Sequence, residues 1–167
     1  TSGIPAAYET RMTYGSSTSP YCPDPRPYPD TAVERHNAGC LSWVYIGHGH
    51  STGLDRVSIP GERFHIFDCD DCSKLQCTSG SPIAIMLACH TAAFDQPKDC
   101  LAEDLLRTEG GPVAVYGGSR VTMPYAMGVM GSAMMQEYFK SRPPTLGETI
   151  LAAKRRMMAP LDDKDPL

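Results

Sequence analysis

The sequence contains no apolar run close to the roughly 20 residues that a membrane helix needs. It also has no excess of positive charge, since 15 Lys and Arg face 19 Asp and Glu for a net charge of -4. This balance gives no electrostatic reason to bind nucleic acid or an anionic membrane, so we expect neither as a partner. Thr1 is not preceded by a methionine or a basic-then-apolar leader, and we expect a mature product or a fragment of a longer protein.

A second domain and internal repeats are also lacking. A chain of 167 residues is about one domain's worth. In "SPYCPDPRPYPD" a proline at every second or third position excludes a helix or a central strand. We therefore expect a proline-rich loop segment over residues 1–36, one domain over 37–160 and a tail over 161–167.

Cysteine, in contrast, is abundant. An odd count of 7 is typical of three disulfides plus one free thiol, which predicts a secreted or otherwise extracytoplasmic protein. A zinc site is the alternative for "FHIFDCDDCSKLQC", where Cys69, Cys72 and Cys77 could act with His65. A second CxxC pair is missing, so we favour disulfides and expect no metal. The cysteines are Cys22, Cys40, Cys69, Cys72, Cys77, Cys89 and Cys100.

Strand-like and helix-like segments alternate after residue 37. Buried strands are predicted over 40–47, 83–88 and 112–118, the first apolar on both faces, with turns and loops over 51–81. Helices are predicted over 31–37, 99–109, 125–141 and 145–158; Gly39 suits the end of the first, and Thr145 with Glu148 caps the last. This alternation indicates an α/β protein with a mainly parallel sheet flanked by helices.

Two strands of this sheet end in reactive residues, His48 and Cys89. Working groups of such sheets lie at the carboxyl ends of the strands, and an imidazole can deprotonate a nearby thiol. The backbone N–H groups of Gly49 and Cys89 could bind an oxyanion. Alternatives remain, because free cysteine is often a buried apolar residue and histidine often structural. His50 or His90 could also be the partner, or His48 and His50 could bind a metal.

Two segments resemble the gingipain-like cysteine peptidases of the caspase-like clan. "NAGCLSWVYIGHGHS" is similar to their histidine segment, and "IAIMLACHTAAFD" to their nucleophile segment. The similarity continues in order through "CLAEDLLRTEGGPVAVYGGSRVTMPY" to "TLGETILAAK". The resemblance implies a caspase-like three-layer α/β/α fold and a cysteine endopeptidase without a cofactor. Its catalytic residues would be His48 and Cys89, acting through a thioester acyl-enzyme, with Gly49 and Cys89 N–H groups as the oxyanion hole.

The same resemblance places the wall of the substrate pocket after the third strand. Its contributors would be Ser119, Arg120 and Tyr125. Gingipain-like enzymes often cut after basic residues, which would require an acidic pocket floor. Candidates for such a floor are Asp55, Asp95 and Glu34, whereas Arg120 near the pocket would favour an acidic P1 residue.

The chain departs from the family pattern in two places. Relatives have further strands and an orienting acidic group before the histidine strand, and many have serine where this chain has His50. We expect either an edge strand from residues 1–40 or a second polypeptide from the same precursor, as in an enzyme made as a zymogen. The other functional hypotheses are a catalytically silent caspase-like interaction module and a zinc-stabilised binding domain.

Overall fold

The computed structural model describes residues 4–16, 18–22 and 24–158. The chain divides into two compact units, Met12–Thr122 and Thr1–Arg11 together with Met123–Leu167. The predicted tail over 161–167 lies outside the described residues. None of the described helices combines the length and the apolar character that crossing a membrane requires.

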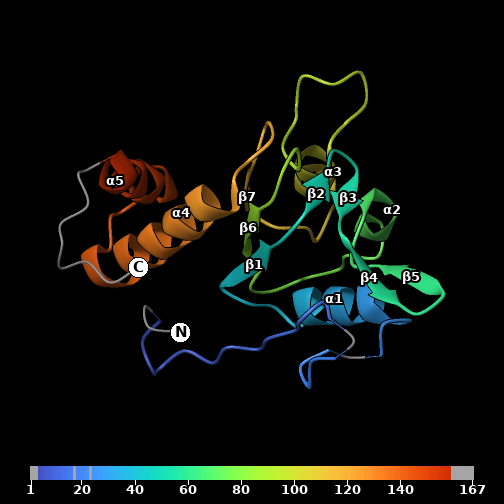
Figure 1. The fold of residues 1–167 in the computed structure, drawn as a ribbon. Coiled ribbons are helices and arrows are strands. Elements are labelled where there is room, and N and C mark those ends of the chain that lie inside the picture. Colours follow the sequence, from blue (N-terminus) through green and yellow to red (C-terminus); the bar gives the residue numbers. More distant parts are fainter. Residues whose placement is uncertain (1–3, 17, 23, 159–167) are drawn as a thin grey trace. The chain divides into compact units, whose positions relative to one another are not determined.

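The Met12–Thr122 unit contains a three-stranded parallel sheet (Figure 1). Its strands are β1 (Ser42–Ile46), β6 (Ile83–Leu87) and β7 (Ala114–Gly117), with β6 between the other two. All three strands were predicted within two residues of their observed bounds. The mixed α/β fold with a parallel sheet flanked by helices is thereby confirmed.

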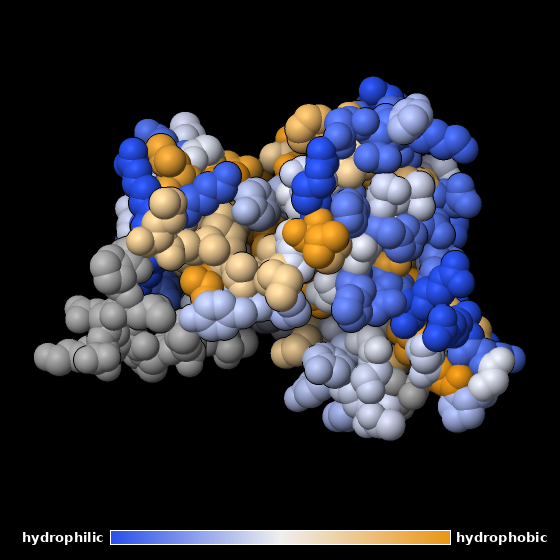
Figure 2. Space-filling model, turned by 45° about the horizontal axis from the view of Figure 1, so that its top comes forward, coloured by the Kyte–Doolittle hydropathy of each residue, from blue (hydrophilic) through white to orange (hydrophobic). Residues whose placement is uncertain are grey.

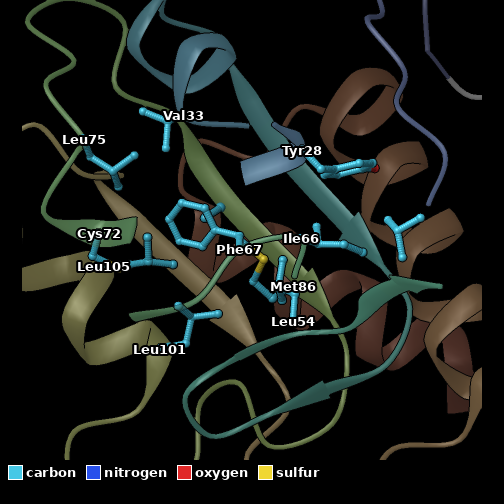
Figure 3. Close-up of a cluster of buried hydrophobic side chains, with 12 residues drawn as sticks. Tyr28, Val33, Leu54, Ile66, Phe67, Cys72, Leu75, Met86, Leu101 and Leu105 are labelled. Carbon is cyan, nitrogen blue, oxygen red and sulfur yellow. The ribbon is translucent and has the colours of Figure 1, made fainter. Parts of the chain in front are cut away.

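One face of this sheet builds the main hydrophobic core. The core lies between this face and the helices α1 (Tyr28–Asn37) and α3 (Leu101–Arg107). Helix α3 packs against β7. Figure 3 shows Phe67 and Met86 near the middle of this cluster. Its buried members are Tyr28, Val33, Leu54, Val57, Ile66, Phe67, Cys72, Leu75, Ala84, Met86, Leu101 and Leu105.

Helix α1 begins earlier than the sequence predicted. It starts at Tyr28 and takes Pro29 into its first turn, although the proline run was expected to exclude a helix. A proline is tolerated there because the N–H groups of a first turn have no partner inside the helix. The helix ends as predicted before Gly39, whose φ is 78°.

Short elements over residues 49–72 correct the prediction of turns and loops. They form two antiparallel hairpins and one helical turn, each too short for a periodic pattern to be visible in the sequence. The first hairpin follows β1 in the sequence after two residues. The elements are β2 (Gly49–His50), β3 (Gly53–Leu54), β4 (Arg56–Ile59), β5 (Glu62–His65) and α2 (Cys69–Cys72).

Strand β1 is not buried on both faces, contrary to the prediction. Val44 is 40% and Ile46 69% exposed. In the part of the chain that the structure describes, β1 pairs with β6 alone, so its outer edge has no strand partner there. Hydrophobic residues reach the surface in several places among hydrophilic ones (Figure 2).

The other unit is helical. Helix α4 (Pro124–Gln136) continues into the π-helical segment η1 (Glu137–Ser141) and packs against α5 (Leu146–Met158) (Figure 1). The predicted cap is confirmed, since the Glu148 N–H donates to Thr145 Oγ1 at 3.2 Å. The Thr145 hydroxyl in turn donates to the Glu148 carboxylate at 2.9 Å, which adds a side-chain link between the cap and the first turn of the helix.

Phe67 and Phe94 allow a matched test of the core. Phe67 is fully buried and Phe94 is 72% exposed. Replacing Phe67 by Ala should lower the free energy of unfolding by about 3–5 kcal/mol, because it removes apolar contacts and leaves a cavity. Phe94→Ala should change it by less than about 0.5 kcal/mol. Urea denaturation followed by circular dichroism measures both, and equal losses would contradict the described core.

Candidate active site

The pairing of β1 with β6 brings the two predicted catalytic residues to the same level of the sheet. The strands run parallel with Ile46 opposite Leu87. His48 and Cys89 each follow two residues after this pair. The register continues past the strands, since the Gly47 N–H donates to the Leu87 carbonyl at 3.4 Å.

Gly49 packs directly against the segment that carries Cys89. A Cβ atom on Gly49 would lie 2.9 Å from the Ala88 Cβ, 2.8 Å from the Thr91 Cγ2 and 3.0 Å from the Cys89 carbonyl oxygen. No larger residue fits at these distances without displacing the neighbouring segment. The structure therefore brings the backbone of the His48–Gly49 segment into contact with that of the nucleophile segment.

The N-terminus of α3 joins the same two segments by hydrogen bonds. The Leu101 N–H donates to the Ser51 carbonyl at 2.6 Å, and the Ala102 N–H donates to the Thr91 carbonyl at 2.9 Å. The first N–H groups of a helix have no partner inside it, so they are available for such contacts. They fix the hairpin after His48 relative to the loop after Cys89.

The His48 side chain is exposed, while its backbone is held by Tyr45. The Tyr45 hydroxyl donates to the His48 carbonyl at 2.8 Å and accepts from the Asp55 N–H at 3.3 Å. Burial raises the pKa of Tyr45 to about 12, so the phenol stays protonated at neutral pH and can donate this bond. The strand end, His48 and the start of β4 are thus tied together.

The two other candidate histidines have different surroundings. His50 Nδ1 lies 3.2 Å from the Thr52 hydroxyl, and the ring lines a hollow shared with His65 and Asp68. His90 follows Cys89 with a φ of 55°, an uncommon conformation for a residue other than glycine. Its N–H donates to the Arg120 carbonyl at 3.2 Å.

Thr122 contacts the Cys89 sulfur through three of its groups. No sequence pattern had indicated a role for this threonine. The Thr122 N–H donates to Cys89 Sγ at 3.4 Å, and the Thr122 hydroxyl lies 3.5 Å from it. The thiol can donate to the Thr122 carbonyl at 3.6 Å. The side-chain and then the backbone hydrogen bonds of Thr122 lower the pKa of the Cys89 thiol, against a smaller opposing effect of burial.

The predicted pocket residues Ser119 and Arg120 lie in the loop after β7, which adjoins the cysteine loop. The Ala92 N–H donates to the Gly118 carbonyl at 3.0 Å. Arg120 makes a two-pronged ion pair with Asp95, at 2.7 and 3.0 Å, which lowers the pKa of that carboxyl. Tyr125 belongs to the other unit, so its place in the pocket stays a prediction.

The three candidates for an acidic pocket floor have different surroundings. Asp95 is neutralised by Arg120, as described above. Asp55 accepts a hydrogen bond from the Arg56 N–H at 2.8 Å. Glu34 is exposed on α1, which packs with the core face of the sheet. The place of each of the three in a substrate pocket stays a prediction.

The predicted disulfides are not present. All seven cysteines lie in the described part of the chain, and all are free thiols. Cys72, Cys77 and Cys100 are buried and act as small apolar residues of the interior. Burial raises the pKa of Cys69, Cys100 and Cys72, the last to about 12. The cysteine count was thus a poor guide to pairing here.

The cysteine-based zinc site is not formed either. Among the residues that the structure describes, the group of possible metal ligands is His65, Asp68 and Asp71, with ligand atoms within 4.8 Å of one another. The buried Asp71 carboxylate instead binds His65 Nε2 at 2.9 Å and Lys74 Nζ at 2.8 Å. These contacts give the cluster a structural role, because they link α2 to His65 and Lys74 on either side of it.

The parallel sheet, with a histidine and a cysteine at adjacent strand ends, defines a caspase-like peptidase fold. The chain belongs to peptidase family C25, whose family model matches residues 2–166. This confirms the gingipain-like resemblance predicted from the sequence. No curated protein sequence matches the chain.

Solved structures of similar fold also include gingipain peptidases. The complex of the pro- and mature domains of RgpB from Porphyromonas gingivalis has a TM-score of 0.67 at 20% identity, over 82% of this chain. The Arg-specific cysteine proteinase gingipain R gives 0.67 at 21% identity, also over 82% of this chain. A third structure, described as a protease, gives 0.59 at 18% identity, over 73% of this chain and 30% of its own. The chain spans 32% of the length of the first two.

The contrast among the cysteines predicts selective labelling. Thiolates, not thiols, react with iodoacetamide, and the pKa is lowered at Cys89 but raised at Cys69 and Cys72. At neutral pH the native chain should be alkylated first at Cys89. Mass spectrometry of the digested protein measures this, with the urea-unfolded chain as the control in which the differences vanish. Faster labelling of Cys69 or Cys72 than of Cys89 in the native chain would contradict the described site.

Proposed function

We propose that the chain carries the catalytic dyad of a cysteine endopeptidase, with Cys89 as nucleophile and His48 as general acid and base. The observation that carries this proposal is the register of β1 and β6, which places the two residues at neighbouring strand ends. The contact of Gly49 with Ala88 and Cys89 supports it. Membership of peptidase family C25 supplies the class of reaction.

In the proposed reaction the Cys89 thiolate attacks the carbonyl carbon of the scissile peptide bond. The resulting oxyanion is bound by the backbone N–H groups of Gly49 and Cys89. Collapse of the tetrahedral intermediate breaks the C–N bond, and protonated His48 gives its proton to the leaving amine. Water, deprotonated by His48, then hydrolyses the thioester and releases the acid and the free thiol.

The backbone of the site suits the oxyanion role. Among the described residues, none of the backbone–backbone hydrogen bonds outside the helices and strands uses the Cys89 N–H group, which itself helps, after the hydrogen bonds of Thr122, to lower the pKa of the Cys89 thiol. Gly49 approaches Ala88 and Cys89 so closely that a side chain would not fit there. The loop from Gly118 to Thr122, which is hydrogen-bonded to the cysteine loop, would form one wall of the substrate pocket through Ser119 and Arg120.

We further propose that another polypeptide segment covers the open side of β1. Val44 and Ile46 are exposed on this strand, and a parallel strand with an open edge and an apolar face is unusual in a soluble protein. The RgpB structure is a complex of pro- and mature domains, so association of two pieces has a parallel in the fold. A second polypeptide of the same precursor fits this surface.

Alanine substitutions test the dyad. Cys89→Ala should abolish hydrolysis of a fluorogenic peptide library, and His48→Ala should lower kcat/KM by at least about a hundredfold, because general acid and base catalysis is lost. Matched controls are His50→Ala and His90→Gly, the latter chosen because φ at this position is 55°. Both controls should retain most of the activity. If His50→Ala proved as damaging as His48→Ala, the assignment of His48 would be wrong.

The mass of the native protein tests the covering segment. Purified from its source without denaturation, the protein should weigh more than the 18.1 kDa of this chain in native mass spectrometry. The extra mass should come from a second polypeptide or from continuous chain, and denaturing electrophoresis distinguishes the two. An active monomer of 18.1 kDa would show that β1 needs no cover.

A further inference from the structure

The Cys89 sulfur lies in a cradle formed by one residue, Thr122. Three groups of Thr122 contact it: the N–H at 3.4 Å, the hydroxyl at 3.5 Å and the carbonyl at 3.6 Å. In the neutral state the S–H group can donate to the carbonyl. In the ionised state the sulfur can accept from the N–H and from the hydroxyl, so two donors face the negative charge.

Packing holds the Thr122 side chain in this orientation. Its Cγ2 methyl occupies the space beside Gly118, where a Cβ atom would lie 2.9 Å from it. The same Cβ would lie 2.5 Å from the Ala88 carbonyl oxygen, so the loop approaches the nucleophile strand at a point where only glycine fits. A β-branched side chain has few χ1 options, and fixing the methyl also fixes the hydroxyl.

Backbone hydrogen bonds hold the loop that carries Thr122. The His90 N–H donates to the Arg120 carbonyl at 3.2 Å, and the Ala92 N–H to the Gly118 carbonyl at 3.0 Å. The Arg120–Asp95 ion pair adds a side-chain link between the same two loops. The cradle is therefore tied to the residues that follow Cys89.

We propose that Thr122 is a further catalytic residue, whose hydroxyl and N–H donate hydrogen bonds to the Cys89 thiolate and keep the nucleophile ionised before substrate binds. This role rests on the proposed function of Cys89. It adds a source of thiolate stabilisation separate from His48, on another loop. When the sulfur forms the thioester it loses its negative charge, and the two donors are released.

A thiolate becomes less nucleophilic as the pKa of its thiol falls. Loss of the Thr122 hydroxyl should therefore have opposite effects on the alkylation rate at low and at high pH. Loss of the hydroxyl bond should raise the midpoint of the pH–alkylation curve of Cys89 by about one unit. At a pH below both midpoints the thiolate fraction then falls about tenfold, while the remaining thiolate becomes about threefold more nucleophilic. The net rate at such a pH should fall about threefold, and the plateau at high pH should rise about threefold.

Thr122→Val is the test variant, because valine keeps the shape and the packed methyl and removes the hydroxyl. Thr122→Ser is the matched control, because it keeps the hydroxyl and removes the methyl. The full chain is alkylated with iodoacetamide across pH 5–10, and mass spectrometry quantifies the Cys89 peptide. The curve of Thr122→Val should cross that of the parent chain. The midpoint of Thr122→Ser should rise less than that of Thr122→Val, because serine keeps the hydroxyl and loses only the methyl that orients it.

An unchanged midpoint in Thr122→Val, or an equal rise in Thr122→Val and Thr122→Ser, would overturn the role of the hydroxyl. Should the valine variant fail to fold by circular dichroism, Thr122→Ala at this half-buried position tests the same loss. Peptide hydrolysis is measured separately. A shifted midpoint in a chain that hydrolyses no peptide would leave the thiolate contact standing while the peptidase function fails.

Discussion

The parallel pairing of β1 with β6 is the constraint on which the candidate site depends. Side chains at the ends of two neighbouring parallel strands meet when the register is correct, and here Ile46 lies opposite Leu87. A slip by one residue would turn every following side chain to the other face and separate His48 from Cys89. The close contact at Gly49 and the two N–H groups of α3 act against such a slip.

The strands of the sheet and the long helices could be predicted because their signals are local. Apolar runs of strand length predict β6 and β7. Thr145 followed by Glu148 predicts the N-terminal cap of α5. His48 and Cys89 could be placed at strand ends for the same reason. Family resemblance then supplied the chemistry that periodicity alone left open.

The remaining features arise from contacts between distant segments. The hairpins after His48 have strands of two to four residues, so their formation depends on neighbours such as the Leu101 N–H. Thr122 reaches the sulfur only because the loop folds back over Gly118. The exposure of Ile46 depends on what pairs with β1, which its own apolar sequence does not reveal. Cysteine composition was misleading because burial, not pairing, accounts for Cys72, Cys77 and Cys100.

The distance along the chain between the two reactive segments has a consequence for biosynthesis. The strand ends that precede His48 and Cys89 are paired across a stretch that contains two hairpins and a helical turn, and such non-local contacts form late in folding. Thr122 arrives later still from the ribosome. A nascent chain would therefore carry Cys89 as an ordinary thiol, and its reactivity would appear when the sheet closes. Under the proposed function, the fold itself would then delay self-digestion during synthesis.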